Sequence, residues 1–502
     1  MRLVDVRALN AFFIFPQKEE MLGVSFTLLL LLVCCGRHVL AARRPTGSGN
    51  NVPSRPTPTA TFDVRNYGAV GDGLTMNTAA FAKAIAAATA NPGGGLVYVA
   101  AGRYLTGTVQ LLNNTYLNVN SDAVILGSPR ESDYIWGAAG LPVVIYAEGV
   151  SNIGIVGAGI LDGQAIPHFI AGYSAMDDEF IPVMWTGPPR NCSGECRPRL
   201  VQFIGCNNIL VRDVTLQNSP DWTSHYYNCA NVLIQNITVF GDHRWPNNDG
   251  IDPDSSVNIT IDGVSVDTGD DGVCPKTDNG APLSNLLVTN SVLRSRSSAF
   301  KLGSATIGDM SDILVENIFV WDSNRALGVQ HRDQGSISNV EFRNIVIDGT
   351  YYNPVSWWGA GEGLWVTTIP RCIVGCAIPG SISDIRFINV TSRRSTNGAF
   401  FGSRSGTPIR GLLLQDVSYH VDDWRAPPHT DLLLSPPEHD YRPTSLGDRI
   451  LGNTDVFYFE GVDVASSKMN NCKGSFGKVK RSWWADCLGG DQVPNSNFTC
   501  QL

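Results

Sequence analysis

Two clusters of acidic residues lie close together in the middle of the chain. The first is Asp249, Asp252 and Asp254, and the second is the pair Asp270 and Asp271. A short segment with alternating apolar residues separates them. If this segment is a strand, it brings the clusters together as an acid/base pair, a cation site or a solvated rim.

The carboxyl groups are suited to hydrolysis of a glycosidic link. That reaction needs one protonated carboxyl group to assist the leaving oxygen and one ionised group to activate water or attack carbon. Crowded carboxylates raise the pKa of one of them, which supplies the acid. A lone Asp pair is more often a solvated turn. The choice between the two interpretations therefore depends on the elements that position these residues.

A repeat runs through the chain from residue 150 onward. Each copy starts with Asn, Asp or Gly, continues with alternating apolar residues, and reaches another Asn, Asp or Gly. Copies start at Asn208, Asn231, Asn258, Asn285, Asp312, Asn339, Asp384 and Gly411, and most starts are 27 residues apart. Short strands joined by turns that tolerate left-handed backbone indicate a β-solenoid. We therefore expect an all-β fold, a single-stranded right-handed parallel β-helix, with the handedness taken from the crossover rule.

The regions outside the repeat have other signatures. Residues 78–90 read as a short N-terminal helix cap, which ends at Asn91-Pro92-Gly93. We expect a signal peptide over residues 1–42, in which 1–20 are an over-extended gene model if Met21 is the true start. A flexible linker over 43–60, a β-helix domain over 61–465 and a disulfide-tied tail over 466–502 complete the predicted organisation.

Secretion makes the cysteines and the sequons interpretable. Of the 12 cysteines, ten remain after the signal peptide, an even number that suits disulfides. The expected loop staples are Cys192/Cys196 and Cys372/Cys376, and the expected tail cysteines are Cys472, Cys487 and Cys500. Glycosylation sequons start at Asn113, Asn191, Asn236, Asn258, Asn389 and Asn497.

Charge and hydropathy narrow the partners. The net charge of -9 and the pI near 5.4 argue against nucleic acid. The apolar run of the signal peptide is too short to span a bilayer and no other stretch is long enough, so we expect no membrane contact after cleavage. We expect a secreted, extracellular or cell-wall monomer without a cofactor.

Constant spacing also predicts which residues stack. Thirteen residues after successive repeat starts lie Asp271, Ser298 and Arg325. On neighbouring coils these side chains would lie about 4.8 Å apart on one face. A longer loop carries Asp249 over the same face, so the two acidic clusters should meet beside a cation.

The stretch Asn247-Asn248-Asp249-Gly250-Ile251-Asp252, followed by Gly269-Asp270-Asp271, resembles the polygalacturonases of glycoside hydrolase family 28. Their signatures are Asn-Thr-Asp and Gly-Asp-Asp on neighbouring coils of a right-handed β-helix. The resemblance implies inverting hydrolysis of α-1,4-galacturonosyl links in pectin, an acidic plant-type cell-wall polysaccharide, without a metal. It implies that Asp270 is the general acid and that Asp249 and Asp271 activate water.

A wider set of residues is predicted to bind the substrate. His225 closes the motif Ser219–His225, which resembles a wall of the family's cleft, and Lys276 matches a lysine that follows the Asp pair in many members. The full set is Asn247, Asp252, His225, Lys276, Ser298, Lys301, Arg325, Gln330, His331 and Arg332. Trp357, Trp358 and Trp365, in an inserted loop over 351–380, could stack on sugars or pack under the loop.

Two family motifs differ in this sequence. The family's Gly-His-Gly falls on Ser297-Ser298-Ala299, and its Arg-Ile-Lys, which grips galacturonate, falls on Gly328-Val329-Gln330. Rhamnogalacturonan hydrolases of the same family also lack these motifs. An alternative hypothesis is therefore hydrolysis of rhamnogalacturonan or another acidic glycan. Two further alternatives are a calcium-dependent, pectate-lyase-like enzyme and a catalytically weakened cell-wall-binding protein.

Overall fold

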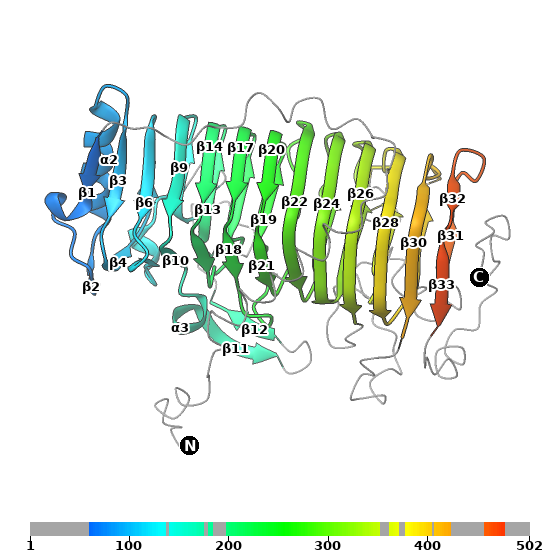
Figure 1. The fold of residues 1–502 in the computed structure, drawn as a ribbon. Helices are drawn as coiled ribbons and strands as arrows, with labels where there is room; N and C mark the ends of the chain where they lie inside the picture. Colours follow the sequence, from blue (N-terminus) through cyan, green and yellow to red (C-terminus); the bar gives the residue numbers. More distant parts are fainter. Residues whose placement is uncertain are drawn as a thin grey trace, which may run out of the picture. The chain divides into compact units, whose positions relative to one another are not determined.

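The computed structural model describes residues 60–136, 140–174, 179–183, 197–351, 361–370, 377–403, 406–422 and 456–476. These residues form a right-handed parallel β-helix, as the repeat predicts. Figure 1 shows the strands following one another along the stack from β1 to β33. Each coil pairs with the coil before it and the coil after it.

The largest sheet contains strands from nearly every coil, and its strands pair in parallel. Its first strands are β1 (Thr61–Asp63), β2 (Asp72–Met76), β3 (Gly95–Val99), β4 (Gly102–Thr106), β6 (Thr115–Val119), β7 (Ala123–Gly127), β9 (Ser151–Gly157) and β10 (Ile160–Asp162). The middle strands are β14 (Asn207–Arg212), β15 (Thr215–Gln217), β17 (Ala230–Gln235), β18 (Thr238–Phe240), β20 (Val257–Asp262) and β21 (Ser265–Thr268). The last are β22 (Leu283–Ser295), β24 (Met310–Ser323), β26 (Ile337–Thr350), β28 (Ile382–Ser395), β30 (Leu413–Val421), β32 (Lys468–Asn470) and β33 (Lys473–Phe476).

A second face is built from two five-stranded parallel sheets in line with each other. The first consists of β5 (Val109–Gln110), β8 (Val143–Glu148), β13 (Arg199–Ile204), β16 (Ser224–Tyr227) and β19 (Ile251–Asp254). The second consists of β23 (Ser298–Gly303), β25 (Arg325–His331), β27 (Leu364–Thr368), β29 (Ala399–Ser403) and β31 (Phe457–Glu460). Bridges from Val273 to Ile251 and to Phe300 join the two sheets across the coil of the Asp pair.

The residue that starts each repeat turns the chain. Asn231, Asn258 and Asn285 have φ values of 57°, 57° and 55°, in the left-handed region where Asn is favoured. Their side chains form a ladder, since Asn285 Nδ2 donates to Asn258 Oδ1 at 3.1 Å and Asn258 Nδ2 to Asn231 Oδ1 at 3.2 Å. The repeat therefore encodes both the turn and a side-chain link between coils.

The interior of the coils is one continuous apolar core. Ile209, Val232, Ile259 and Leu286 occupy one interior column on successive coils and are at most 1% exposed. Burying one such side chain contributes about 1.5–3 kcal/mol. Because a single coil cannot enclose these residues, stacking itself creates the core.

Short helices accompany the first coils. The helix expected over residues 78–90 forms as α2 (Thr78–Ala90), and its apolar face, which includes Phe81 and Ile85, joins the core. Its function as a cap remains a prediction. Two 3-10 turns, η2 (Val64–Tyr67) and η3 (Glu131–Asp133), lie nearby in the sequence.

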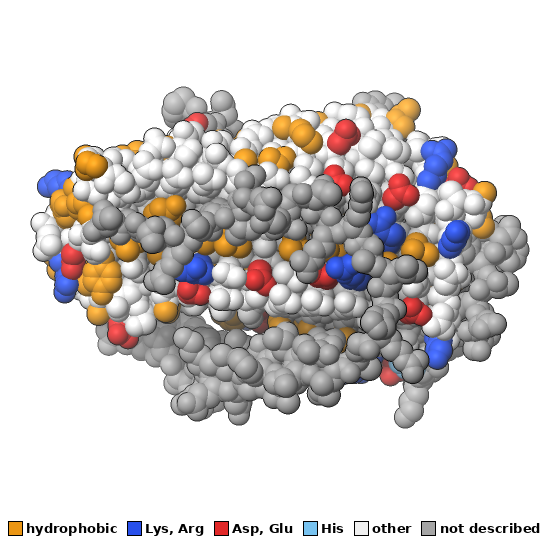
Figure 2. Space-filling model, turned by 45° about the horizontal axis from the view of Figure 1, so that its top comes forward, with side chains coloured by type: hydrophobic (Ala, Val, Ile, Leu, Met, Phe, Trp, Pro, Cys, Tyr) orange, Lys and Arg blue, Asp and Glu red, His pale blue; other side chains and the backbone are white. Residues whose placement is uncertain are grey.

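One insertion departs from the solenoid. It contains α3 (Ala165–Phe169) and the antiparallel hairpin of β11 (Ile170–Ser174) and β12 (Glu179–Pro182). In Figure 1 these elements lie beside the stacked coils. On the face that Figure 2 shows, described acidic and basic side chains are interspersed.

Several predictions concern residues outside the described ranges. These are the signal peptide, the linker apart from residue 60, Trp357, Trp358, the sequons at Asn191 and Asn497, and the cysteines at 192, 196, 372, 376, 487 and 500. Within the described part, Cys206, Cys229 and Cys274 are buried free thiols. No described helix is long and apolar enough to cross a bilayer.

Candidate active site

Four predicted residues occupy one column on the second face. The bridges of Val273 to Ile251 and Phe300 set Asp249, Asp271 and Ser298 on adjacent coils. Ser298 is in turn the direct partner of Arg325. The backbone continues the ladder, because Gly250 N donates to Asp271 O and Gly272 N to Ser298 O, both at 2.8 Å.

Asp270 is held by its neighbours in a fixed orientation. Its backbone N–H donates to Asn248 Oδ1 at 2.8 Å, and its own Oδ1 accepts from the Asp271 N–H at 2.8 Å. Asn248 Nδ2 donates to Asp242 O at 3.0 Å, which fixes the amide. A Cβ on Gly269 would lie 2.9 Å from Asn248 Oδ1, so glycine lets this amide approach the Asp pair.

Asp271 is surrounded by groups that favour its ionised form. Lys301 forms an ion pair with Oδ2, and Ser297 Oγ donates to Oδ1 at 2.8 Å. The Ser298 N–H donates to the same Oδ1 at 3.3 Å. A carboxylate that accepts several hydrogen bonds and faces an ammonium group is stabilised in its charged state.

Asp249 and Asp252 share one ammonium group. Lys276 Nζ lies 3.0 Å from Asp249 Oδ2 and also donates to Asp252 Oδ1. All three side chains are buried. Lys276 therefore balances part of the negative charge that Asp249 adds beside the Asp pair.

The environment separates the pKa values of the three central carboxyl groups. Burial, followed by the charges of Asp249 and Asp271, raises the pKa of Asp270 well above its ordinary value. Burial also acts to raise the pKa of Asp271, but Lys301 and Lys276 outweigh it and lower that pKa. Burial raises the pKa of Asp249, with Asp271 adding to the rise against Lys276. Adjacent carboxyl groups whose pKa values shift in opposite directions can act as a general acid and a general base.

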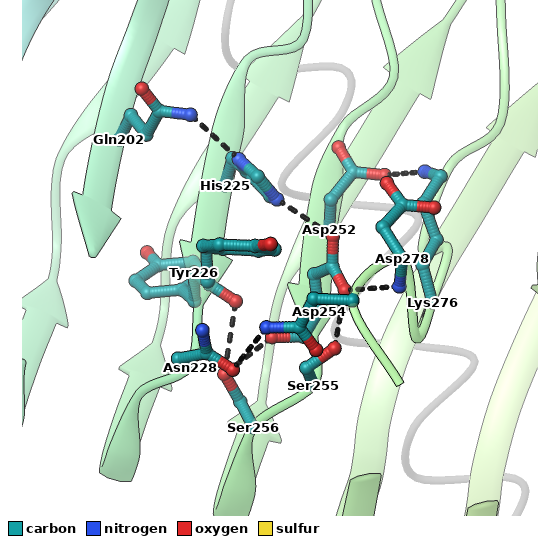
Figure 3. Close-up of polar contacts among 12 residues, drawn as sticks. Gln202, His225, Tyr226, Asn228, Asp252, Asp254, Ser255, Ser256, Lys276 and Asp278 are labelled. Atoms are coloured by element: carbon teal, nitrogen blue, oxygen red, sulfur yellow. Dashed lines mark hydrogen bonds and ion pairs between the residues drawn. The ribbon is translucent and has the colours of Figure 1, made fainter. Parts of the chain in front are cut away.

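His225 lies one coil before Asp252 and is a neutral hydrogen-bonding residue. Its Nδ1 lies 2.7 Å from Arg199 Nη1 and 3.0 Å from Gln202 Nε2, both donors, so Nδ1 accepts and Nε2–H donates to Asp254 at 3.2 Å. Figure 3 shows Gln202, His225 and Asp254 in this sequence. Burial and the charges of Arg199 and Lys276 lower the pKa of His225 well below its ordinary value.

The other predicted binding residues occupy varied positions. Asn247 Oδ1 accepts from Arg197 at 2.7 Å. Gln330 and His331 lie at the far end of β25, roughly 17–20 Å from Arg325 at the rise of an extended strand. His331 Nε2 contacts Gly335 O at 2.6 Å and Arg332 Nη2 donates to Pro370 O at 3.2 Å. His331 Nδ1 also lies 3.1 Å from Thr368 Oγ1, so these contacts of His331 and Arg332 are with residues outside the Asp column.

Arg325 reaches the predicted column but already has an ionic partner. Its Nε and Nη2 donate to the two carboxylate oxygens of Glu362 at 3.0 and 3.2 Å, and its guanidinium lies 4.0 Å from the centroid of the Trp365 ring. A Cβ on Gly328 would lie 2.1 Å from Trp365. Glycine at position 328 therefore leaves room for the buried Trp365 ring.

We expect Arg325→Ala to lower the free energy of unfolding by about 3–5 kcal/mol, because it leaves Glu362 buried without its ionic partner. Denaturant unfolding of the wild type and the variant measures this loss. The matched control is the double variant Arg325→Ala/Glu362→Gln, which should recover part of the loss. Wild-type stability in Arg325→Ala would show that the pair contributes little.

A group of metal-ligating atoms overlaps the Asp column. Single donor atoms of Asp249, Asp271 and Cys274 all lie within 4.8 Å of one another. Calcium prefers six to eight oxygen ligands, whereas this group includes a thiol and the ammonium groups of Lys276 and Lys301 already pair with its carboxylates. The donor set suits calcium poorly, which weakens the lyase hypothesis.

Sequence reasoning missed four residues of the site. Asn248 and Ser297 stand directly beside residues that were singled out. Trp222, whose ring centroid lies 4.1 Å from Lys276 Nζ, lies inside the motif that ends at His225. Arg199 is the fourth, and no repeat position identifies it. In the sequence, Asn248 could have been identified as a polar residue directly before Asp249 that faces glycines on the next coil.

The fold and the carboxyl groups define a β-helical glycoside hydrolase, and comparisons support this class. The sequence matches the glycosyl hydrolases family 28 over residues 108–420. It is 30% identical over 367 residues to a probable polygalacturonase of Vitis vinifera, covering 71% of this chain and 73% of the relative. It is 28% identical over 357 residues to a probable rhamnogalacturonase B of Aspergillus fumigatus, covering 69% and 61%.

A solved structure supports the fold. The exopolygalacturonase of Thermotoga maritima superimposes with a TM-score of 0.63 at 22% identity and covers 90% of this chain and 96% of its own. The protein belongs to glycoside hydrolase family 28.

Proposed function

We propose that the protein is a secreted, monomeric hydrolase that cleaves galacturonosyl links of pectin with inversion at the anomeric carbon. The observation that carries the proposal is the opposite pKa shift of the adjacent Asp270 and Asp271. Asp270 is protonated and Asp271 is ionised over the same range of pH. The name of the grapevine relative, a probable polygalacturonase, supports the substrate class.

The reaction follows from these states. Asp270 gives its proton to the glycosidic oxygen as the bond to the anomeric carbon breaks. A water molecule held by Asp271 and Asp249 attacks that carbon from the opposite side, and its proton passes to this carboxylate pair. The next turnover requires that the proton return to Asp270.

A second candidate substrate is rhamnogalacturonan. Ser298 and the run Gly328-Val329-Gln330 replace the family's galacturonate-binding motifs, and Trp365 fills the space over Gly328. The similarity to a probable rhamnogalacturonase also favours this candidate. Both substrates contain galacturonate and need the same acid and base.

A substrate panel tests the proposal. Incubation with polygalacturonan, rhamnogalacturonan and xylogalacturonan should release reducing ends from at least one of them, equally with and without a chelator. Products should lack the ultraviolet absorbance of an unsaturated sugar. Chelator-sensitive, unsaturated products would establish a lyase instead, and binding without any product would establish a wall-binding protein.

A further inference from the structure

Asn248 is a buried residue whose amide links three segments around Asp270. It is 1% exposed. Its Oδ1 accepts from the backbone N–H of Asp270 at 2.8 Å, and its Nδ2 donates to the carbonyl oxygen of Asp242 at 3.0 Å. The same carbonyl accepts from the N–H of Trp245 at 3.0 Å. One side chain therefore ties the loop that carries Asp249 to the turn that carries Asp270.

Two glycines enclose this amide. A Cβ on Gly241 would lie 2.3 Å from Asn248 Nδ2, and a Cβ on Gly269 would lie 2.9 Å from Asn248 Oδ1. Both distances are too short for a carbon atom, so any larger residue at either position would displace the amide. The absence of a side chain at 241 and at 269 therefore leaves the amide in reach of the Asp270 N–H.

The backbone of Asp270 is also fixed on its carbonyl side. Its O accepts from Thr268 Oγ1 and from Ser295 Oγ, both at 2.7 Å. Its carboxyl Oδ1 accepts from the N–H of Asp271 at 2.8 Å. Because Oδ1 is already an acceptor, the proton of the acid is carried by Oδ2. The direction of Oδ2 depends on the backbone of Asp270, which Asn248 fixes at its N–H.

The contacts of the Asn248 amide are not part of the family signature. That signature, Asn-Thr-Asp, has threonine where this chain has Asn248. A general acid must lie within hydrogen-bond reach of the leaving oxygen, and a displacement of about 1 Å can cost about a hundredfold in rate. A side chain that fixes the backbone of Asp270 can therefore control the acid without contacting the substrate.

We propose that Asn248 is a positioning residue for the general acid. Its amide, held between Gly241 and Gly269, directs the carboxyl group of Asp270 toward the leaving oxygen. Asn248 acts through Asp270 and gives no proton itself. The inference rests on the proposed function, because it explains how the acid of that reaction is oriented.

Substrates with different leaving groups test this role. Asn248→Ala should lower kcat at least about tenfold on galacturonate oligosaccharides, because a sugar alkoxide is a poor leaving group and needs the proton of the acid. It should change kcat less than about twofold for release of dinitrophenolate from a galacturonate oligosaccharide with a 2,4-dinitrophenyl group at its reducing end, since this group leaves without a proton. An equal loss on both substrates would show a general structural defect and overturn the proposal.

A second variant keeps Asn248 and moves its amide. In Gly241→Ala, the three atoms nearest to the new Cβ all belong to the Asn248 side chain. This variant should also lower kcat on the oligosaccharides about tenfold. The double variant Gly241→Ala/Asn248→Ala has no such clash, so its loss should equal that of Asn248→Ala alone. Losses that add up in the double variant would contradict the proposal.

The matched control is Asn120→Ala. Asn120 follows β6 and makes the same kinds of bond, since its Oδ1 accepts from the N–H of Asp122 at 3.0 Å and its Nδ2 donates to Tyr98 Oη at 3.1 Å. Its removal should leave kcat on both substrates unchanged. A loss in this variant equal to that of Asn248→Ala would also overturn the proposal.

Hydrogen exchange separates this inference from the proposed function. If the wild type releases neither reducing ends nor dinitrophenolate, the proposed function fails. Exchange of the Asp270 amide proton still decides whether Asn248 holds the backbone of Asp270, because Asn248→Ala should speed it at least about tenfold. An unchanged exchange rate would show that Asn248 does not position this residue.

Discussion

Asp270→Asn is expected to lower kcat at least about a hundredfold while leaving KM nearly unchanged, because the amide cannot give a proton to the leaving oxygen. A hundredfold loss corresponds to about 2.7 kcal/mol of transition-state stabilisation. The substitution keeps the shape of the side chain and the acceptor for the Asp271 N–H. Reducing-end assays under saturating substrate measure the change.

The matched control is Asp262→Asn. Asp262 lies at the end of β20, on the preceding strand of the same coil, where its carboxylate accepts from Gln235 and Asn290. This variant should retain wild-type kcat. If Asp270→Asn also retained it, the assignment of the general acid would be wrong.

The raised pKa of Asp270 fixes the alkaline side of the pH profile. The protonated acid exists below its folded pKa and disappears as the pH rises through it, so kcat/KM should fall on that side. Since burial and two neighbouring carboxylates raise this pKa, activity should extend to a higher pH than an ordinary Asp would allow.

Lys301→Met is expected to move the acidic side of the profile to higher pH by about one unit or more, because it removes the ion pair that lowers the pKa of Asp271. The base acts only above its folded pKa, and that pKa rises when the ammonium group is lost. At the wild-type optimum, kcat/KM should fall at least about tenfold. Initial rates across pH measure both effects.

Two controls accompany this experiment. Lys83→Met removes an exposed lysine of α2 and should leave the profile unchanged, whereas Lys301→Arg should keep part of the wild-type behaviour. An acidic side at the wild-type pH in Lys301→Met would mean that Ser297 and the Ser298 N–H suffice to keep Asp271 ionised.

The repeat predicts the coils and the column of Asp271, Ser298 and Arg325, because equal spacing preserves the register from coil to coil. Asp249 joins this column from the longer loop of the preceding coil. The Asn residues at the turns of the repeat also have a physical reason, because they adopt left-handed backbone and hydrogen-bond to one another across coils. The positions of these residues can therefore be predicted by counting along the sequence. Contacts that the register of the coils does not determine cannot be predicted in this way.

The pairing of Arg325 with Glu362 is one such contact. Glu362 lies 37 residues further on, within the inserted stretch over 351–380 that interrupts the 27-residue period. The contacts of Arg199 and Gln202 with His225 are another, because they depend on the direction of side chains on β13. Spacing predicts neighbouring backbones, whereas the partner of a long polar side chain depends on packing.

The asparagine ladder has a consequence for how the protein unfolds. Each coil contacts only the coil before it and the coil after it, so thermal opening starts as fraying at the terminal coils and moves inward one step at a time. The coils of Asp249, Asp271 and Ser298 have several coils on either side. The residues proposed to be catalytic are therefore in the segment that we expect to open last, protected by the coils on either side.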